Sequence, residues 1–146
     1  MDVTPGEAAQ RERAEMLKRV SREMAQIQKQ AFGKGPRSTK SYLFDDLLLI
    51  VMREGLTQAE HTMLRFGQAD LVRSFRQQFQ NEMEAPLTEM VERDTGHKVL
   101  AYQSQILFNP DVVVEIFIFD RAGDGFVTAE APDDDDVEGV TSPHEE

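Results

Sequence analysis

Two strand-sized apolar segments constrain the fold of this chain more than any other feature of its sequence. Val112–Phe119 is a nearly continuous run of β-branched and aromatic residues broken by Glu115, and Leu47–Met52 is the longest apolar stretch. The first run is typical of a central strand that is covered on both faces or lies at a dimer contact. Each run follows a further strand-like segment after a short turn, so the sequence predicts two antiparallel hairpins. The hairpins comprise Thr39–Phe44 with Leu47–Arg53, around Asp45-Asp46, and Val99–Phe108 with Val112–Phe119, around Asn109-Pro110-Asp111.

A helical pattern precedes the first hairpin. From Glu7 to Ala31, apolar residues recur at alternating three- and four-residue steps and form one stripe on a helix. The stripe barely reaches two heptads, so packing within the same fold is favoured, and a dimer seam remains the alternative. Gly33, Gly35 and Pro36 end this helix. The stripe consists of Leu17, Val20, Met24, Ile27 and Ala31.

The region between the hairpins predicts a short helix followed by a long one. Thr57 and Glu60 form a Ser/Thr-x-x-Glu capping arrangement, which satisfies backbone donors at a helix start. Gly67 separates the two helices, Pro86 kinks or restarts the second because proline donates no backbone hydrogen bond, and Gly96 ends it. The apolar face predicted for the long helix contains Leu71, Phe75, Phe79, Met83, Leu87 and Met90.

These elements predict a single α+β domain with the order α-β-β-α-α-β-β. Its four strands form an antiparallel sheet, and its helices pack on one face. We expect a flexible N-terminus over residues 1–6, the domain over residues 7–121, and an acidic disordered tail over residues 122–146, where apolar periodicity is lost. The residues expected in the core are Leu49, Val51, Phe75, Phe79, Val114, Ile116 and Ile118.

Composition limits the classes of partner and chemistry. The formal net charge of -11 opposes nonspecific attraction to nucleic acid, and neither a spanning helix nor the apolar core of a secretory signal is present. We therefore expect a cytoplasmic protein that binds no nucleic acid and does not insert directly into a membrane. The absence of cysteine excludes thiolate catalysis and cysteine-ligated zinc, and we expect no cofactor.

A basic loop provides the best candidate for ligand chemistry. Its cations and hydroxyls lie beside Gly33 and Gly35, where backbone amides can approach a phosphate, carboxylate or bicarbonate. The spacing is not that of a phosphate-binding loop, and the segment precedes a strand instead of a helix. The simpler alternative is a turn shaped by glycine and proline with solvated cations. The candidate anion-binding residues are Lys34, Arg37, Ser38, Thr39 and Lys40.

Other polar residues favour structural roles. Asp45 and Asp46 most simply occupy a turn, because neighbouring strand residues point to opposite faces and would not share one ion. The three histidines have no metal-ligand neighbour at i+4, and no serine lies in a nucleophile elbow, so we expect neither a metal site nor a catalytic residue. For Glu115, a rim or edge position is favoured over a buried functional acid.

Three ordered segments of the sequence carry a family resemblance. They are FGKGPRSTKSYLFDDLLLIVMREGLTQAEHTML, GQADLVRSFRQQFQNEM and HKVLAYQSQILFNPDVVVEIFIF. Together they resemble the small MpsC-like family, named for a subunit of a sodium-translocating, membrane-potential-generating system. The resemblance covers roughly Ala8 to Phe119 and implies association with membrane-potential generation or with coupled ion and bicarbonate transport.

The leading hypothesis is a non-catalytic accessory or regulatory protein that acts through a protein surface. Its implied partner is another protein, an integral membrane transporter being the expected kind, and the apolar Val112–Phe119 run together with the stripe of the first helix predicts a homodimer. The alternative is a small-anion or nucleotide sensor that uses the loop from Lys34 to Lys40. A hydrolase with scattered catalytic residues is the third and least supported hypothesis.

Overall fold

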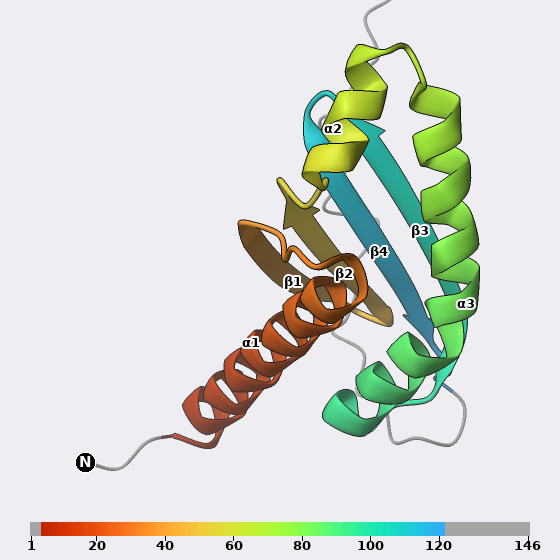
Figure 1. Ribbon diagram of the computed structural model, residues 1–146. Helices are drawn as coiled ribbons and strands as arrows, with labels where there is room; N and C mark the ends of the chain where they lie inside the picture. The colour runs from red at the N-terminus through yellow and green to blue at the C-terminus, as the bar shows by residue number, and fades with distance from the viewer. Residues whose placement is uncertain (1–3, 122–146) are drawn as a thin grey trace, which may run out of the picture.

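A computed structural model describes residues 4–121 of the chain. The acidic tail predicted for residues 122–146 lies outside the described residues. The fold is the α+β arrangement expected from the sequence, with one four-stranded antiparallel sheet and three helices (Figure 1). The elements are α1 (Pro5–Phe32), β1 (Ser38–Phe44), β2 (Leu47–Arg53), α2 (Gln58–Arg65), α3 (Ala69–Thr95), β3 (Val99–Phe108) and β4 (Asp111–Phe119).

The two predicted hairpins form and join through their second strands. The strand order is β1-β2-β4-β3, so the two apolar runs, on β2 and β4, lie side by side at the centre of the sheet. Leu49 pairs with Ile116 in the middle of the β2–β4 ladder, and every ladder in the sheet is antiparallel. The edge strands are the less continuously apolar β1 and β3, as edge positions require.

All three helices lie on one face of the sheet (Figure 1). α1 packs mainly on β1, and α3 packs on β3 and on α1. Val20 and Met24 of the predicted α1 stripe are fully buried in the common core, with Leu17 and Ile27 packed against it. The stripe therefore packs within the same fold, which was the favoured alternative.

The helix ends follow the local sequence signals. Thr4 accepts a hydrogen bond from the Glu7 amide, and α1 begins at Pro5, two residues before the expected start. Gly33 and Gly96 adopt left-handed conformations, with φ of 77° and 74°, and end α1 and α3. These conformations suit glycine because a Cβ atom would be strained there. α3 continues through Pro86 and bends in its second half (Figure 1).

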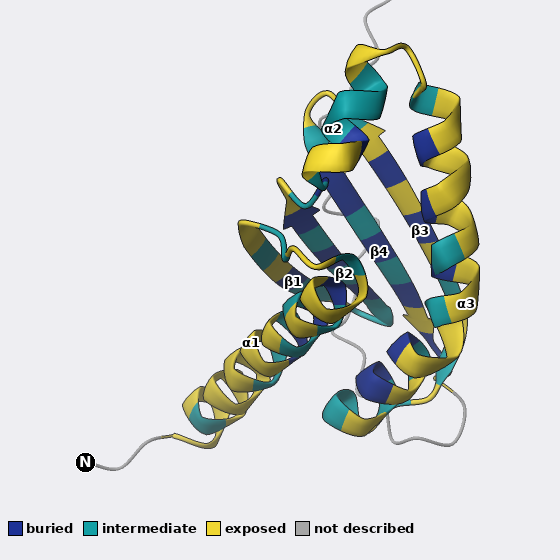
Figure 2. Cartoon of the chain, in the orientation of Figure 1, coloured by how far each residue is buried: buried dark blue, intermediate teal, exposed yellow. Residues whose placement is uncertain are grey.

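The seven residues expected in the core are not the ones that the helices cover. On β2 the buried side chains are Leu48, Ile50 and Met52, which alternate with the expected ones (Figure 2). β4 shows the same reversal. Because successive strand residues point to opposite faces and both faces are apolar here, composition alone does not tell which face is covered. On α3, Phe75 and Leu71 are more than half exposed, and Val72 lies inside instead.

Candidate functional site

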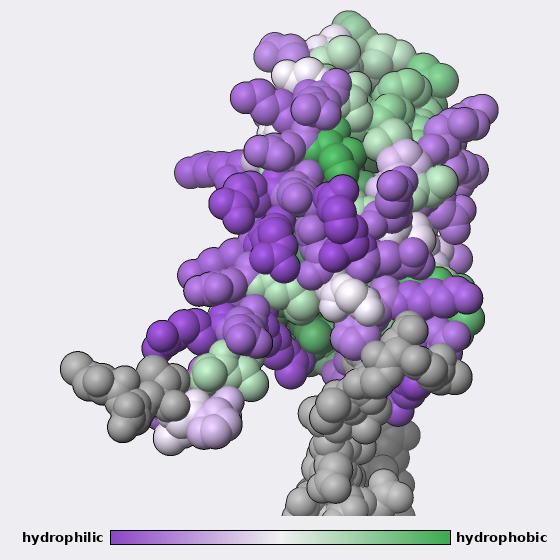
Figure 3. Space-filling model, turned by 90° about the horizontal axis from the view of Figure 1, so that it is seen from below, coloured by the Kyte–Doolittle hydropathy of each residue, from purple (hydrophilic) through white to green (hydrophobic). Residues whose placement is uncertain are grey.

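Exposed large apolar side chains concentrate in two places on this molecule. Figure 3 shows hydrophobic side chains gathered toward one end of an otherwise mostly hydrophilic surface. Among the described residues, one group lies at the start of α3 and the preceding turn, and the other lies on the sheet. The first group is Phe66, Leu71 and Phe75, and the second is Phe44, Leu100, Leu107 and Ile118.

The first surface is a groove between the end of α1, α2 and α3, which we call the α2–α3 groove. It has a volume of about 580 Å³, and Phe32, Met63, Leu71 and Phe75 form its apolar walls. A second hollow of about 640 Å³ continues along α3 and shares Leu71 and Phe75 with the first. The ring centroids of Phe32 and Phe75 lie 6.3 Å apart in an edge-to-face arrangement. The groove is thus an open aromatic surface.

A buried ion pair lies beside the α2–α3 groove, and its carboxylate partner, Glu60, contributes to the groove lining. The Arg76 guanidinium donates from Nε to Glu60 Oε2 at 2.6 Å and from Nη2 to Glu60 Oε1 at 2.5 Å, and it stacks on the Phe32 ring at 3.8 Å. Glu60 also accepts from the Thr57 amide and completes the predicted capping box of α2. Burial opposes ionisation of Glu60, but the hydrogen bonds from Arg76 and Thr57 outweigh it and hold the pKa of Glu60 below its usual range.

The sequence predicted the cap but not the ion pair. Glu60 and Arg76 are 16 residues apart on different helices, and only the packing of α2 on α3 brings them together. The only signal in the sequence was an arginine one position after Phe75, beside the predicted apolar face of the long helix. Its burial makes sense only with a carboxylate beside it, because an unpaired buried charge is costly.

The second surface is the face of the sheet opposite the helices, which we call the open face. In the described part of the chain, no helix or strand covers it. Its central rows carry only aliphatic side chains, most of them half-buried among their neighbours. Tyr42 and Phe44 stack on the β1 side with ring centroids 6.0 Å apart. The central rows are Leu47, Leu49 and Val51 on β2 and Val114, Ile116 and Ile118 on β4.

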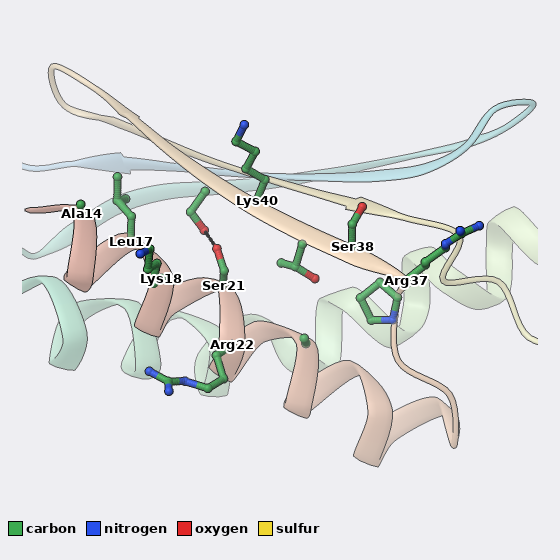
Figure 4. A pocket seen from close by; sticks show the side chains of 12 residues that line it. Ala14, Leu17, Lys18, Ser21, Arg22, Arg37, Ser38 and Lys40 are labelled. Atoms are coloured by element: carbon green, nitrogen blue, oxygen red, sulfur yellow. Dashed lines mark hydrogen bonds between the residues drawn. The ribbon is translucent and has the colours of Figure 1, made fainter.

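The residues of the predicted anion site are divided between different surroundings. A cavity of about 570 Å³ between α1 and β1 is lined by Arg37, Ser38, Thr39 and Lys40, but not by Lys34. Figure 4 shows Lys40 and Ser38 pointing away from α1 and Arg37 pointing out beyond the start of the strand. The cationic groups of the predicted anion site, Lys34, Arg37 and Lys40, therefore do not converge on the cavity.

Two of these cations already have protein partners. Lys34 donates to the Leu56 carbonyl oxygen at 3.0 Å, and an exposed ion pair joins Arg37 to Glu54 at 3.3 Å. Lys40 Nζ lies 5.4 Å from the centre of the Tyr42 ring. The cavity itself is spanned at its inner end by a hydrogen bond of 2.6 Å between the Ser21 and Ser41 hydroxyls. Anion binding at this loop stays a prediction.

Glu115 is fully buried, so the rim or edge position favoured from the sequence is wrong. β4 is a central strand, and the residue faces the helices. The Ser104 hydroxyl donates to its Oε1 at 2.9 Å, and the Tyr102 hydroxyl donates to its Oε2. Burial raises the pKa of the Glu115 carboxyl to about 7, and the two hydroxyl donors and the charge of Arg76 only partly oppose it.

The paired aspartates stand where the sequence placed them. Asp45 and Asp46 form the β1–β2 turn, and both make ion pairs with Arg121. Asp45 has a φ of 56°, a left-handed conformation that aspartate tolerates in turns. Within residues 4–121, no three His, Asp or Glu side chains gather into a group that could hold a metal ion.

A comparison with protein-family models matches residues 12–121 to the model described as Na+-translocating membrane potential-generating system (MpsC). The match spans most of the chain and contains the whole sheet, α2, α3 and most of α1. The chain belongs to the MpsC family. The comparison with curated proteins found no match, and neither did the comparison with solved structures.

Both apolar surfaces of this MpsC-family chain lie inside the matched region. The name of the family links it to a sodium-translocating membrane system. Between residues 4 and 121, none of the helices of the chain combines the length and apolarity that crossing a bilayer requires.

Proposed function

We propose that this MpsC-family protein is a non-catalytic accessory subunit, on the cytoplasmic side, of a membrane system that translocates Na+ and generates membrane potential. The α2–α3 groove receives an amphipathic helical segment of the integral membrane partner. The observation that carries the proposal is the exposure of Phe75 and Leu71, 55% and 54%, in an open apolar groove within the family-matched region. Contiguous exposed apolar surface of this kind marks interaction sites on soluble domains.

The length of the groove fits a short helix. Its lining runs along α3 from Leu71 to Glu82, and at a rise of about 1.5 Å per residue this stretch is roughly 17 Å long, or about three turns. A partner helix of similar length would place apolar residues at i, i+3 or i+4 and i+7 against the groove. Phe32, Phe75 and Phe79 offer aromatic rings for these anchors.

The border of the groove is polar. Ser74, Gln78 and Glu82 lie along one side of the apolar wall, next to Phe75 and Phe79. An apolar centre with a polar rim is the usual anatomy of a reversible protein interface. The Glu60–Arg76 pair below the wall has internal partners, so the occupant needs to supply only apolar contacts at the centre.

Site-specific photo-crosslinking in native membranes tests the proposal. A photoreactive amino acid replaces Phe75 in the full chain, and the cross-linked product is identified by mass spectrometry. We expect an integral membrane protein of an ion-translocating system. The matched control carries the same group at Gln77, which is exposed two residues further along α3 and faces Asn81.

Complementation supplies the functional measurement. Cells that lack the protein should show a reduced membrane potential, and the wild-type chain and Gln77→Glu should restore it. Phe75→Glu should fail because a carboxylate opposes apolar contacts in the groove. Equal restoration by both variants, or cross-links from Phe75 to soluble proteins alone, would overturn the proposal.

A further inference from the structure

We propose that the open face is the contact surface of a twofold homodimer in which the sheets of two copies pack face to face. This inference goes beyond the accessory function, because it concerns a second copy of this chain and uses the surface opposite the α2–α3 groove. Sheets that pack in this way lie about 10 Å apart with their strands nearly aligned.

The chemistry of the open face is that of a core and not of a solvated surface. The six central positions of β2 and β4 are leucine, isoleucine or valine, and Ile118 is 38% exposed. Gln103 and Gln105 flank them on β3, and Tyr42 flanks them on β1. A copy of the same surface offers matching aliphatic rows, as an isologous interface requires.

The extent of the face suits a small specific dimer. Four strands spaced about 4.8 Å apart, with about seven residues each at a rise of about 3.3 Å, outline roughly 400 Å² on one copy. The flat area covered on two copies is then about 800 Å², and the uneven surface of the side chains adds to the area that is buried. This outline lies below the lower limit of standard interfaces, about 1,200 Å², so we expect a reversible dimer of modest affinity.

Charge at the two ends of the face favours a second copy over other occupants. Lys40 and Arg53 lie toward one end of the β1–β2 hairpin, where Glu54 is already paired with Arg37, and the Asp45-Asp46 turn lies at the other end. The turn keeps a net negative charge because Arg121 offsets only one of its two carboxylates. A twofold axis across the strands places the cationic end of each copy over the acidic turn of its partner, which complementary interfaces require.

Because the chain contains no cysteine, a single introduced cysteine is the only thiol available for cross-linking. A twofold axis through the centre of the face brings Ile116 of one copy near Ile116 of the other. We expect the full-length wild type to sediment as a dimer, and Ile116→Cys to be joined to its twofold mate by a thiol-specific bifunctional cross-linker that spans about 10 Å, the distance between the two sheets. Val114→Cys, one step along the same row, is displaced from its twofold mate by four residues, about 13 Å along the strand, and should cross-link less. Phe75→Cys, in the α2–α3 groove, is the matched control and should not cross-link.

A charged substitution measures the contribution of the apolar rows. Ile116→Lys should raise the dimer dissociation constant by at least about 30-fold, as expected for a central interface residue, while Phe75→Lys should leave it unchanged. Circular dichroism of each variant checks that the monomer is folded. A wild type that stays monomeric at high micromolar concentration would overturn the inference, as would a dimer that cross-links through Phe75 and not through positions 114 or 116. Neither outcome bears on the membrane partner, which is tested by the Phe75 photo-cross-link.

Discussion

The two faces of β2 have nearly the same composition and different surroundings. On β2, Leu48 and Ile50 are fully buried under the helices, whereas Leu47 and Leu49 are only partly shielded by their neighbours. An isolated strand would show no preference between them, because each face is aliphatic. The difference teaches that burial on these strands is decided by which face the helices reach, and not by the hydrophobicity of the residues.

The two faces also differ in their polar groups. The covered face contains Glu115, and the nearby helices contribute Glu60 and Arg76, and each of these charged groups has a fixed partner. Along the central rows of the open face every side chain is aliphatic. The covered face is therefore part of the protein core, and its polar groups are hydrogen-bonded. The open face has the composition of a core, but no helix or strand among the described residues packs on it.

The largest expected effect contrasts neighbouring residues of β4 that point to opposite faces. Phe117→Ala should lower the free energy of unfolding by about 3–5 kcal/mol, because it opens a cavity in the core. Ile118→Ala should lower it by about 1 kcal/mol when the chain is dilute and monomeric, because its side chain is already partly in water. Urea denaturation measures both values. Similar losses for the two variants would show that the open face is covered within one chain.

A smaller loss should follow removal of one partner of the buried ion pair. Arg76→Leu leaves the Glu60 carboxylate buried without its counter-ion, so we expect a loss of about 3 kcal/mol at neutral pH. Arg37→Leu breaks the exposed pair with Glu54 and should cost less than about 1 kcal/mol. If both variants unfold at the same urea concentration, the Glu60–Arg76 pair contributes no more than a surface pair.

The pH dependence of the free energy of unfolding should reflect the titration of Glu115. Its pKa is about 7 in the folded chain and about 4.5 when unfolded, so the folded state binds the extra proton between these values. The stabilisation that Glu115 adds to the folded state is fully present below about pH 4.5 and is lost as the pH rises through about 7. Glu115→Gln should therefore flatten the fall in stability over this window, measured as the urea midpoint at several pH values. A variant that keeps the wild-type slope would assign the slope to other groups.

The smallest effect is expected from the basic loop. A Lys34/Arg37/Lys40 triple alanine variant removes one bond to a carbonyl oxygen and one exposed ion pair, so it should lose only about 1–2 kcal/mol of stability. Because the cations do not converge, calorimetry with phosphate, bicarbonate and ATP should give flat titrations for the wild type. Salt-sensitive binding that disappears in the triple variant would instead support the anion-sensor alternative.

Local signals in the sequence were sufficient for the elements and their order. The Thr57–Glu60 capping box, the glycines at positions 33 and 96, and the Asp45-Asp46 turn each act over four residues or fewer, so the chain specifies them without its tertiary structure. The hairpins followed from short turns between β-rich runs. The family was also evident from ordered motifs, because these survive in the linear sequence.

Only the tertiary structure decided which residues each element buries. The positions of Leu49 and Phe75 were wrong because two apolar faces, or two overlapping helix stripes, fit the sequence equally well. Glu115 was misplaced because its hydroxyl partners, Tyr102 and Ser104, reach it only through the β3–β4 register. The Glu60–Arg76 contact likewise exists only after α2 packs on α3. These cases share one physical reason. The burial of a side chain and its pairing depend on neighbours that are distant in sequence, whereas helix caps and turns depend on residues only a few positions away.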